Sequence, residues 1–181
     1  MPQFGSSTVI PARVRLIMLD CFDTLVEHQD WTYLARRGVV EFLAHFSKKR
    51  NVALVVVSDA EESAIVAALD QAKLSGYFGR IYHAGNASQD LGHGRRRKRL
   101  DIPLVDLGIA AADALFIGDS PADAESARFH SIPFIRVPRS EDRAFTFASL
   151  ITGPSCYNSG DFSAAMMKYY LGDDKPPAKP T

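Results

Sequence analysis

The sequence predicts an α/β fold in which a mostly parallel sheet of five strands is covered by helices on both faces. Apolar segments of strand length alternate with segments whose apolar residues recur at helical spacing. The strand segments are largely apolar, which is typical of parallel strands buried on both faces. The chain has 181 residues, which suits one domain with a sizeable core.

The predicted elements follow one another along residues 13–138. Strands are expected at 14–19, 52–57, 81–84, 114–117 and 133–137, and helices at 39–50, 60–74, 100–107 and 121–129. Pro121 suits the first position of a helix, where its missing N–H has no partner to lose. Ser58 or Asp59 is expected to cap the helix over 60–74. A flap or hairpin is expected at 27–31, and a glycine-rich polar loop at 85–94.

The ends of the chain differ from this regular part. Residues 1–12 are expected to form an irregular lead-in. Residues 139–171 are expected to form a C-terminal segment whose terminal helix, over 161–171, packs on the domain. Residues 172–181 carry three prolines and few apolar side chains, which predicts a flexible tail.

Composition narrows the setting. Lysine and arginine (21) balance aspartate and glutamate (21), so net charge predicts no polyanionic partner. Two cysteines, Cys21 and Cys156, are too few for a disulfide framework or a zinc site. An intracellular, reducing compartment is therefore expected, with the cytoplasm first and an organelle matrix left open. No apolar segment is long enough to span a bilayer, so no membrane partner is expected.

Polar residues follow three of the predicted strands. Asp20, Ser58 and Asp119 stand where these strands end, and Asp123 lies one helical turn after Asp119. Because parallel strands share one carboxyl edge, these side chains are expected to converge there. Carboxylates suit a hard cation such as Mg²⁺, while a hydroxyl and a lysine suit a phosphoryl group.

The same residues resemble the motifs of the haloacid dehalogenase (HAD) superfamily. The resemblance rests on residues 19–25 (LDCFDTL), 57–58 (VS) and 116–123 (FIGDSPAD), and it covers roughly residues 14–138. It implies a Rossmann-like three-layer αβα fold. The intervals between the motifs leave no room for a cap domain, so a capless member is expected, with a phosphorylated substrate that is either a small molecule or a macromolecule.

Further implications of the resemblance concern catalysis and substrate binding. Asp20 matches the nucleophilic aspartate, which forms an aspartyl-phosphate in phosphatase members. Ser58 matches the hydroxyl that holds the phosphoryl oxygens. Lys98 is assigned as the lysine that neutralises charge on the nucleophile and the phosphoryl group. Thr24 and Asp59 are expected to join Ser58 and Lys98 in contacting the substrate.

Metal binding is implied in the same way. Asp119 matches the aspartate that binds Mg²⁺, and Asp123 matches its partner or orienting residue. Asp20 and the backbone carbonyl of Phe22 complete the expected ligands.

Phe22 is the main departure from the family pattern. Phosphatase members carry a second aspartate two residues after the nucleophile, where it protonates the leaving group and then activates water. A phenyl ring can do neither, and losing a general acid or base typically costs about 10²–10⁴-fold in rate. Asp23 lies one residue later, and only a re-aimed loop would bring it into this role. Dehalogenases and phosphonatases of the family tolerate a non-acidic residue here, so their chemistry is a further alternative, although dehalogenase chemistry relies on a cap and a capless member is expected.

Two hypotheses from different classes follow. The first is a capless, Mg²⁺-dependent phosphatase acting through Asp20. The second is a HAD-fold structural or binding subunit of a protein or ribonucleoprotein assembly, without meaningful turnover. In the second, the basic block Arg95–Arg99 would contact RNA or a partner protein, although such a block is also typical of a solvated loop. Oligomerisation stays open.

Overall fold

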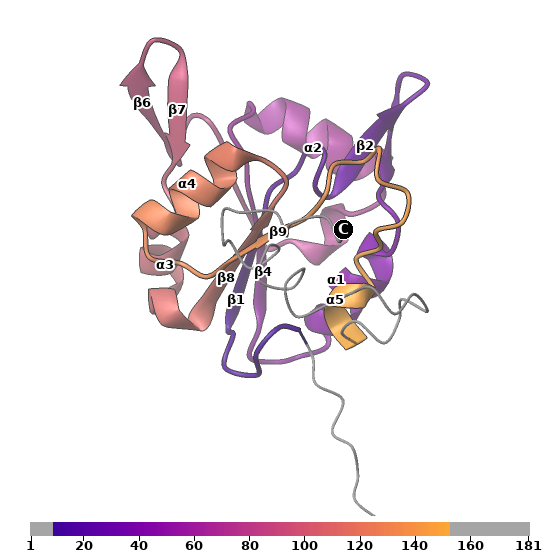
Figure 1. The fold of residues 1–181 in the computed structure, drawn as a ribbon, viewed down its shortest axis with the longest axis horizontal. Coiled ribbons are helices and arrows are strands. Elements are labelled where there is room, and N and C mark those ends of the chain that lie inside the picture. Colours follow the sequence, from indigo (N-terminus) through magenta and orange to yellow (C-terminus); the bar gives the residue numbers. More distant parts are fainter. Residues whose placement is uncertain (1–8, 153–181) are drawn as a thin grey trace, which may run out of the picture.

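Five parallel strands form the centre of the protein, whose computed structural model describes residues 9–152 (Figure 1). They lie in the order β5–β4–β1–β8–β9. Their bounds are β1 (Leu16–Leu19), β4 (Ala53–Val57), β5 (Arg80–Tyr82), β8 (Ala114–Gly118) and β9 (Phe134–Arg136). The predicted five-stranded parallel sheet is thereby confirmed. The chain moves outward from β1 in one direction and returns to its other side at β8, and such a switch point is where open α/β sheets bind ligands.

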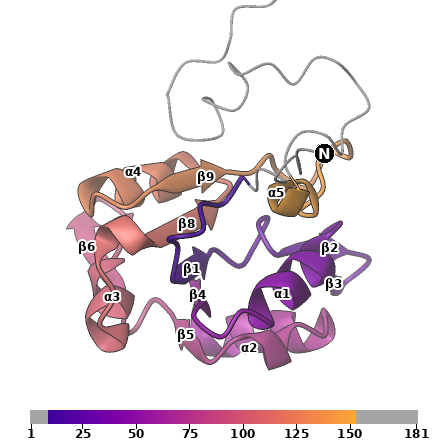
Figure 2. The same ribbon diagram turned by 90° about the horizontal axis from the view of Figure 1, so that it is seen from below.

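Helices cover both faces of the sheet (Figure 2). Helices α1 (Val39–Ser47) and α2 (Glu62–Gln71) lie on one face, and α3 (Asp101–Leu107) and α4 (Pro121–Phe129) on the other. Alternate residues of β1 enter the two cores, Ile17 and Leu19 on the first side and Leu16 and Met18 on the second. All four side chains are fully buried, which explains why the strand is apolar throughout.

Two antiparallel hairpins project from the same end of the molecule (Figure 1). The first joins β2 (Val26–Gln29) to β3 (Thr32–Ala35), which confirms the predicted hairpin and extends it. The second joins β6 (Ser88–Gly92) to β7 (Arg95–Lys98), where a loop was expected. The left-handed backbone of His93 and Gly94 makes the tight turn, so the glycines of this segment serve a hairpin.

The start of α2 also differs from the prediction. The residue that precedes the helix is Glu61, and it makes no side-chain capping bond, so the expectation that Ser58 or Asp59 caps this helix is wrong. The Ser58 hydroxyl instead accepts a hydrogen bond from the amide of Ala60 at 3.4 Å. Three short helical elements complete the description, η1 (Ser75–Tyr77), η2 (Ala111–Asp113) and α5 (Ser149–Thr152). No helix among the described residues has the length and apolar character to cross a membrane.

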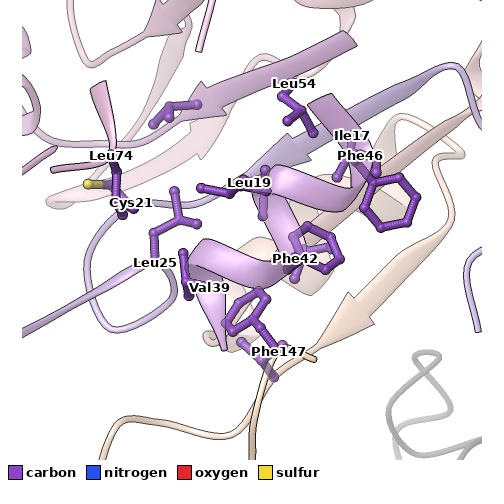
Figure 3. Packing of buried hydrophobic residues seen from close by; sticks show 14 of the residues in the cluster. Ile17, Leu19, Cys21, Leu25, Val39, Phe42, Phe46, Leu54, Leu74 and Phe147 are labelled. Atoms are coloured by element: carbon purple, nitrogen blue, oxygen red, sulfur yellow. The ribbon is translucent and has the colours of Figure 1, made fainter. Parts of the chain in front are cut away.

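The segment after β9 packs back onto α1. Phe147 lies against Val39 and Phe42, with 5.5 Å between the ring centroids of Phe42 and Phe147 (Figure 3). Gly38 has a φ of 77°, and a Cβ there would meet Thr146 Oγ1 and lie 2.7 Å from the Ala148 nitrogen. This close approach requires glycine. The helix predicted at 161–171 lies outside the described residues, as do Cys156 and the tail.

Candidate active site

Three carboxylates meet at the carboxyl edge of the sheet. Asp20 directly follows β1, Asp119 directly follows β8, and Asp123 lies in the first turn of α4. One carboxylate oxygen of each lies within 4.8 Å of the others, and all three residues are buried. The convergence expected from the strand ends is therefore present, because β1 and β8 are adjacent and parallel.

Thr24 bridges two of these carboxylates. Its hydroxyl lies 3.4 Å from Asp20 Oδ2 and 3.2 Å from Asp119 Oδ1, and the side chain is fully buried. A hydroxyl has one proton to donate, so it can serve only one of the two carboxylates at a time. Thr24 therefore orients the carboxylates of Asp20 and Asp119 in this structure. The substrate contact expected of Thr24 from the sequence stays a prediction.

Lys98 is the only cation that touches both Asp20 and Asp123 among the described residues. Its Nζ lies 2.6 Å from Asp20 Oδ1 and 2.5 Å from Asp123 Oδ1. Strand β7 positions Lys98 and is held against α4 by two contacts. The Lys98 amide donates to Ser126 Oγ of α4 at 3.2 Å, and the guanidinium of the neighbouring Arg97 lies 3.9 Å from the centroid of the Phe129 ring. The hairpin of β6 and β7, which we call the basic hairpin, is therefore anchored to α4, and Lys98 at its end lies in the site.

The shared charge perturbs each group. Burial and the negative charges of Asp123 and Asp119 together raise the pKa of Asp20 to about 7, although Lys98 acts in the opposite direction. Burial also raises the pKa of Asp119. Burial alone would lower the pKa of Lys98, but its contacts with Asp20 and Asp123 outweigh this and raise the pKa above its ordinary value. Lys98 therefore remains charged, and its single ammonium group faces three carboxylates.

This imbalance fits a divalent cation. Three carboxylates face the buried ammonium of Lys98 and the exposed guanidinium of Arg139, so in their ionised forms they carry an excess of negative charge. A hard cation such as Mg²⁺ would compensate this charge through its preferred oxygen ligands. Asp123 is held in place at the start of α4, where its Oδ2 accepts a hydrogen bond from the Ser120 amide at 3.2 Å. A Cβ on Gly118 would lie 2.5 Å from the same oxygen, so β8 must end in glycine.

Ser58 and Asp59 lie at the same edge but outside this network. Ser58 is buried, and its hydroxyl bonds to the Ala60 amide and to none of the three carboxylates. Asp59 Oδ1 lies 3.5 Å from Ser88 Oγ at the start of β6. These two predicted residues border the cluster of Asp20, Asp119 and Asp123 without joining it.

Phe22 and Asp23 occupy the turn after the nucleophile position. The half-buried Phe22 ring packs edge-to-face on Tyr33, with 5.4 Å between centroids. Asp23 has a left-handed backbone with a φ of 56°, and its carboxylate accepts from Ser140 Oγ at 3.4 Å. Besides burial, the charge of Asp23 contributes to the raised pKa of Asp119, but the Asp23 carboxylate makes no hydrogen bond with Asp20 in this structure.

Sequence reasoning missed the arginines around this turn. Buried Arg36 donates to the carbonyl of Asp23 and, at 2.8 Å, to that of Pro138. Arg139 follows on the rim, with its Nε 3.6 Å from Asp119 Oδ2 and 67% of its side chain exposed. The position of Arg139 had a signal, since it lies just beyond β9, whose carboxyl end borders the same edge. Arg36 had none, because its carbonyl partners are distant in sequence.

Comparison with known proteins agrees with this geometry. The family model of haloacid dehalogenase-like hydrolases matches residues 18–137. No curated protein sequence matches the chain.

Several solved structures are similar in fold. A predicted phosphoglycolate phosphatase from Haemophilus somnus has a TM-score of 0.59 at 12% identity, covering 76% of this chain and 96% of that one. A HAD-superfamily hydrolase of subfamily IA from Geobacter sulfurreducens has a TM-score of 0.55 at 18% identity, covering 70% and 93%. The N-terminal part of a Bacteroides fragilis protein, containing a phosphatase domain complexed with Mg, has a TM-score of 0.55 at 14% identity, covering 70% and 37%. On the family match and the strand-edge cluster, this chain belongs to the haloacid dehalogenase-like hydrolases.

Proposed function

We propose that this hydrolase is a Mg²⁺-dependent phosphatase whose nucleophile is Asp20. The observation that carries the proposal is the contact of Lys98 Nζ with both Asp20 Oδ1 and Asp123 Oδ1, at 2.6 and 2.5 Å, beside Asp119. A phosphate monoester brings negative charge to this edge, and a fixed cation beside the attacked group stabilises the charge that develops there.

Mg²⁺ would be held by the carboxylates of Asp20, Asp119 and Asp123 and by the carbonyl of Phe22. The bound ion would supply further neutralisation of the phosphoryl oxygens. The excess of carboxylates over Lys98 supports this assignment, as does the hard-oxygen character of the donors.

The chain's own residues would then act in two steps. A carboxylate oxygen of Asp20 attacks phosphorus, the bond to the leaving oxygen breaks, and an aspartyl-phosphate forms. Water then attacks this phosphorus, which releases phosphate and restores the Asp20 carboxylate. Lys98 compensates the charge on Asp20 and the phosphoryl group throughout, and the Ser58 hydroxyl would turn from Ala60 to donate to a phosphoryl oxygen.

The buried Cys21 thiol, with no disulfide partner in the described part of the chain, fits an intracellular setting.

Phosphate release from an aryl phosphate tests the proposal. The wild-type protein is assayed with and without Mg²⁺, and Asp20→Asn serves as the blank because it removes the nucleophilic carboxylate while keeping the size of the side chain. Turnover that needs Mg²⁺ and is absent from the blank is the expected result. Rates equal to the blank, in folded protein that still binds Mg²⁺, would overturn the proposal.

Phe22→Asp provides a second test of the same site. The change restores an acid at the position where family phosphatases carry one, so turnover is expected to rise by about 10²-fold or more. An unchanged rate in a variant that remains folded would mean that more than the acid differs from an active phosphatase. Circular dichroism and urea unfolding check the fold, because the Phe22 ring packs on Tyr33.

Phe22 also favours a second candidate, a HAD-fold binding subunit without turnover. A partner, RNA or protein, would meet the basic hairpin at Arg95 and Arg96, which are exposed. Arg97 is already engaged by Phe129, so it is not offered as a contact. RNA binding measured in Arg95→Ala/Arg96→Ala, with exposed Arg15→Ala as the control, tests this role. Loss of RNA binding in the double variant but not in the control supports this role. Equal RNA binding by the double variant and the control excludes the basic hairpin as the contact.

A further inference from the structure

A line of aromatic rings runs from the site turn to the tip of the β2–β3 hairpin. Phe22 contacts Tyr33 at 5.4 Å between centroids, Tyr33 contacts His28 at 5.1 Å, and His28 contacts Trp31 at 6.4 Å. We call these four residues the aromatic ladder. It begins two residues after Asp20, at the position where other family phosphatases carry their acid.

The outer end of the ladder is fully open to solvent. Trp31 is 93% exposed and is the only tryptophan in the chain. Asp30 and Trp31 both have left-handed backbones, with φ of 46° and 68°, and form the turn of the hairpin. A bulky residue rarely adopts this conformation. The large ring is thus held outward on a hairpin that continues directly from the site turn.

The chemistry beside Asp20 restricts the leaving group. When Asp20 takes the phosphoryl group, the electron pair of the broken P–O bond stays on the leaving oxygen, and Phe22 has no proton to give it. The carboxylate of Asp23 accepts a hydrogen bond from Ser140 and makes none with Asp20 in this structure. A phenol, with a pKa of about 10 as in tyrosine, leaves as its anion far more easily than an aliphatic alcohol, which is nearly as weak an acid as water.

The aromatic ladder and the lack of a proton donor at Phe22 favour the same class of substrate. We propose that the site hydrolyses phosphate monoesters of phenols, such as phosphotyrosine, with the phenol ring lying against the inner rings of the aromatic ladder, Phe22 and Tyr33. The inference rests on the proposed phosphatase function and names its substrate class. The phosphoryl group passes to Asp20, the phenolate takes a proton from a water molecule, and the hydroxide left by that water attacks phosphorus of the aspartyl-phosphate, which releases phosphate and restores the Asp20 carboxylate. The sum is one ester and one water giving one phenol and one phosphate.

Relative turnover is the first arm of the test. kcat/KM is measured with phenyl phosphate, phosphotyrosine, glycerol phosphate and adenosine monophosphate, using Asp20→Asn as the blank. The phenol esters are expected to react at least about 100-fold faster than either alkyl ester, and Phe22→Asp is expected to narrow the gap, because a restored acid helps the poorer leaving group most. Equal rates would overturn the inference, as would a preference for adenosine monophosphate, which carries an aromatic base on an alkyl ester.

Binding is the second arm, and it does not depend on turnover. The affinity of the Mg²⁺-loaded wild-type protein is measured by calorimetry for benzylphosphonate and butylphosphonate, which carry no ester bond to hydrolyse. Benzylphosphonate is expected to bind about 10-fold more tightly, as expected for ring stacking. Equal affinities would overturn the substrate class even if phosphatase activity is present. Preferential binding without turnover of any ester would refute the catalytic proposal alone.

Tyr33→Leu and Tyr77→Leu form a matched pair for both arms. Both tyrosines are half-buried and pack on the same core. Tyr77, however, lines a cavity with Val52 and Ala53 at the start of β4, the opposite edge of the sheet. Tyr33→Leu is expected to raise KM for phenyl phosphate about 10-fold and to leave KM for glycerol phosphate unchanged, while Tyr77→Leu changes neither. A similar effect of the two variants, or of Tyr33→Leu on both substrates, would refute the role of the ladder.

Discussion

Replacing Lys98 by methionine tests whether the site is held together by one buried cation. The Lys98 side chain is 5% exposed, and its ammonium contacts Asp20 and Asp123 at 2.6 and 2.5 Å. Methionine keeps much of the length and the apolar stem, so the change removes mainly the charge. Breaking a buried ion pair on one side costs about 3–5 kcal/mol, because the remaining charge is left without a partner. For a chain of this size, such a loss corresponds to a fall in Tm of roughly 6–20 °C.

The loss is expected to depend on pH. Asp20 has a folded-state pKa of about 7, above its ordinary value of 3.8, so the folded state binds its proton more tightly than the unfolded state does. Stability therefore falls as pH rises from about 4 to about 7. Lys98 lowers the pKa of Asp20, and without it this fall extends to higher pH. At pH 5 Asp20 is largely protonated in both proteins, so Lys98→Met costs less there than at pH 8.

Urea unfolding at pH 5 and pH 8, in EDTA, measures both effects. Lys48→Met is the control, since Lys48 is exposed at the end of α1. It is expected to change the free energy of unfolding by less than about 1 kcal/mol. A loss in Lys98→Met no larger than the control, or equal at the two pH values, would refute the view that Lys98 balances the buried carboxylates.

Three further predictions concern other parts of the molecule. Asp119→Asn should raise the Tm of the metal-free protein, because burial raises the pKa of Asp119 and its ionised form weakens folding at neutral pH; it should also abolish the rise in Tm on adding Mg²⁺, and a retained rise would contradict its role as a ligand. Gly38→Ala should lose about 1–3 kcal/mol more in urea unfolding than Gly92→Ala, because both glycines have φ near 80° but only at Gly38 would a Cβ meet other residues; equal losses would refute the close packing of residues 146–148. Burial and the charge of Asp20 raise the pKa of the Cys21 thiol to about 12, so in a Cys156→Ser background this thiol should react with a disulfide reagent only after unfolding, and rapid reaction of the native protein would contradict its burial.

The sequence by itself determined the sheet and the carboxylate edge. Continuous apolar runs indicate strands buried on both faces, and parallel strands necessarily bring their carboxyl ends to one edge. The positions of Asp20, Asp119 and Asp123 follow from these local facts, and so does the absence of an acid at Phe22. Lys98 was also assigned to this site from the sequence, although the segment that carries it was expected to be a loop.

Only the tertiary structure decided how the intervening segments serve that edge. Residues 88–98 form a hairpin because β7 pairs with β6, and the arginines of β7 contact Glu125 and Phe129 of α4, which lie about thirty positions further along the chain. The aromatic ladder likewise exists only because the β2–β3 pairing sets His28 opposite Tyr33. Such contacts depend on long-range pairing and on which face of a strand a ring occupies. A linear pattern of glycines, arginines and isolated aromatic residues does not encode either one by itself.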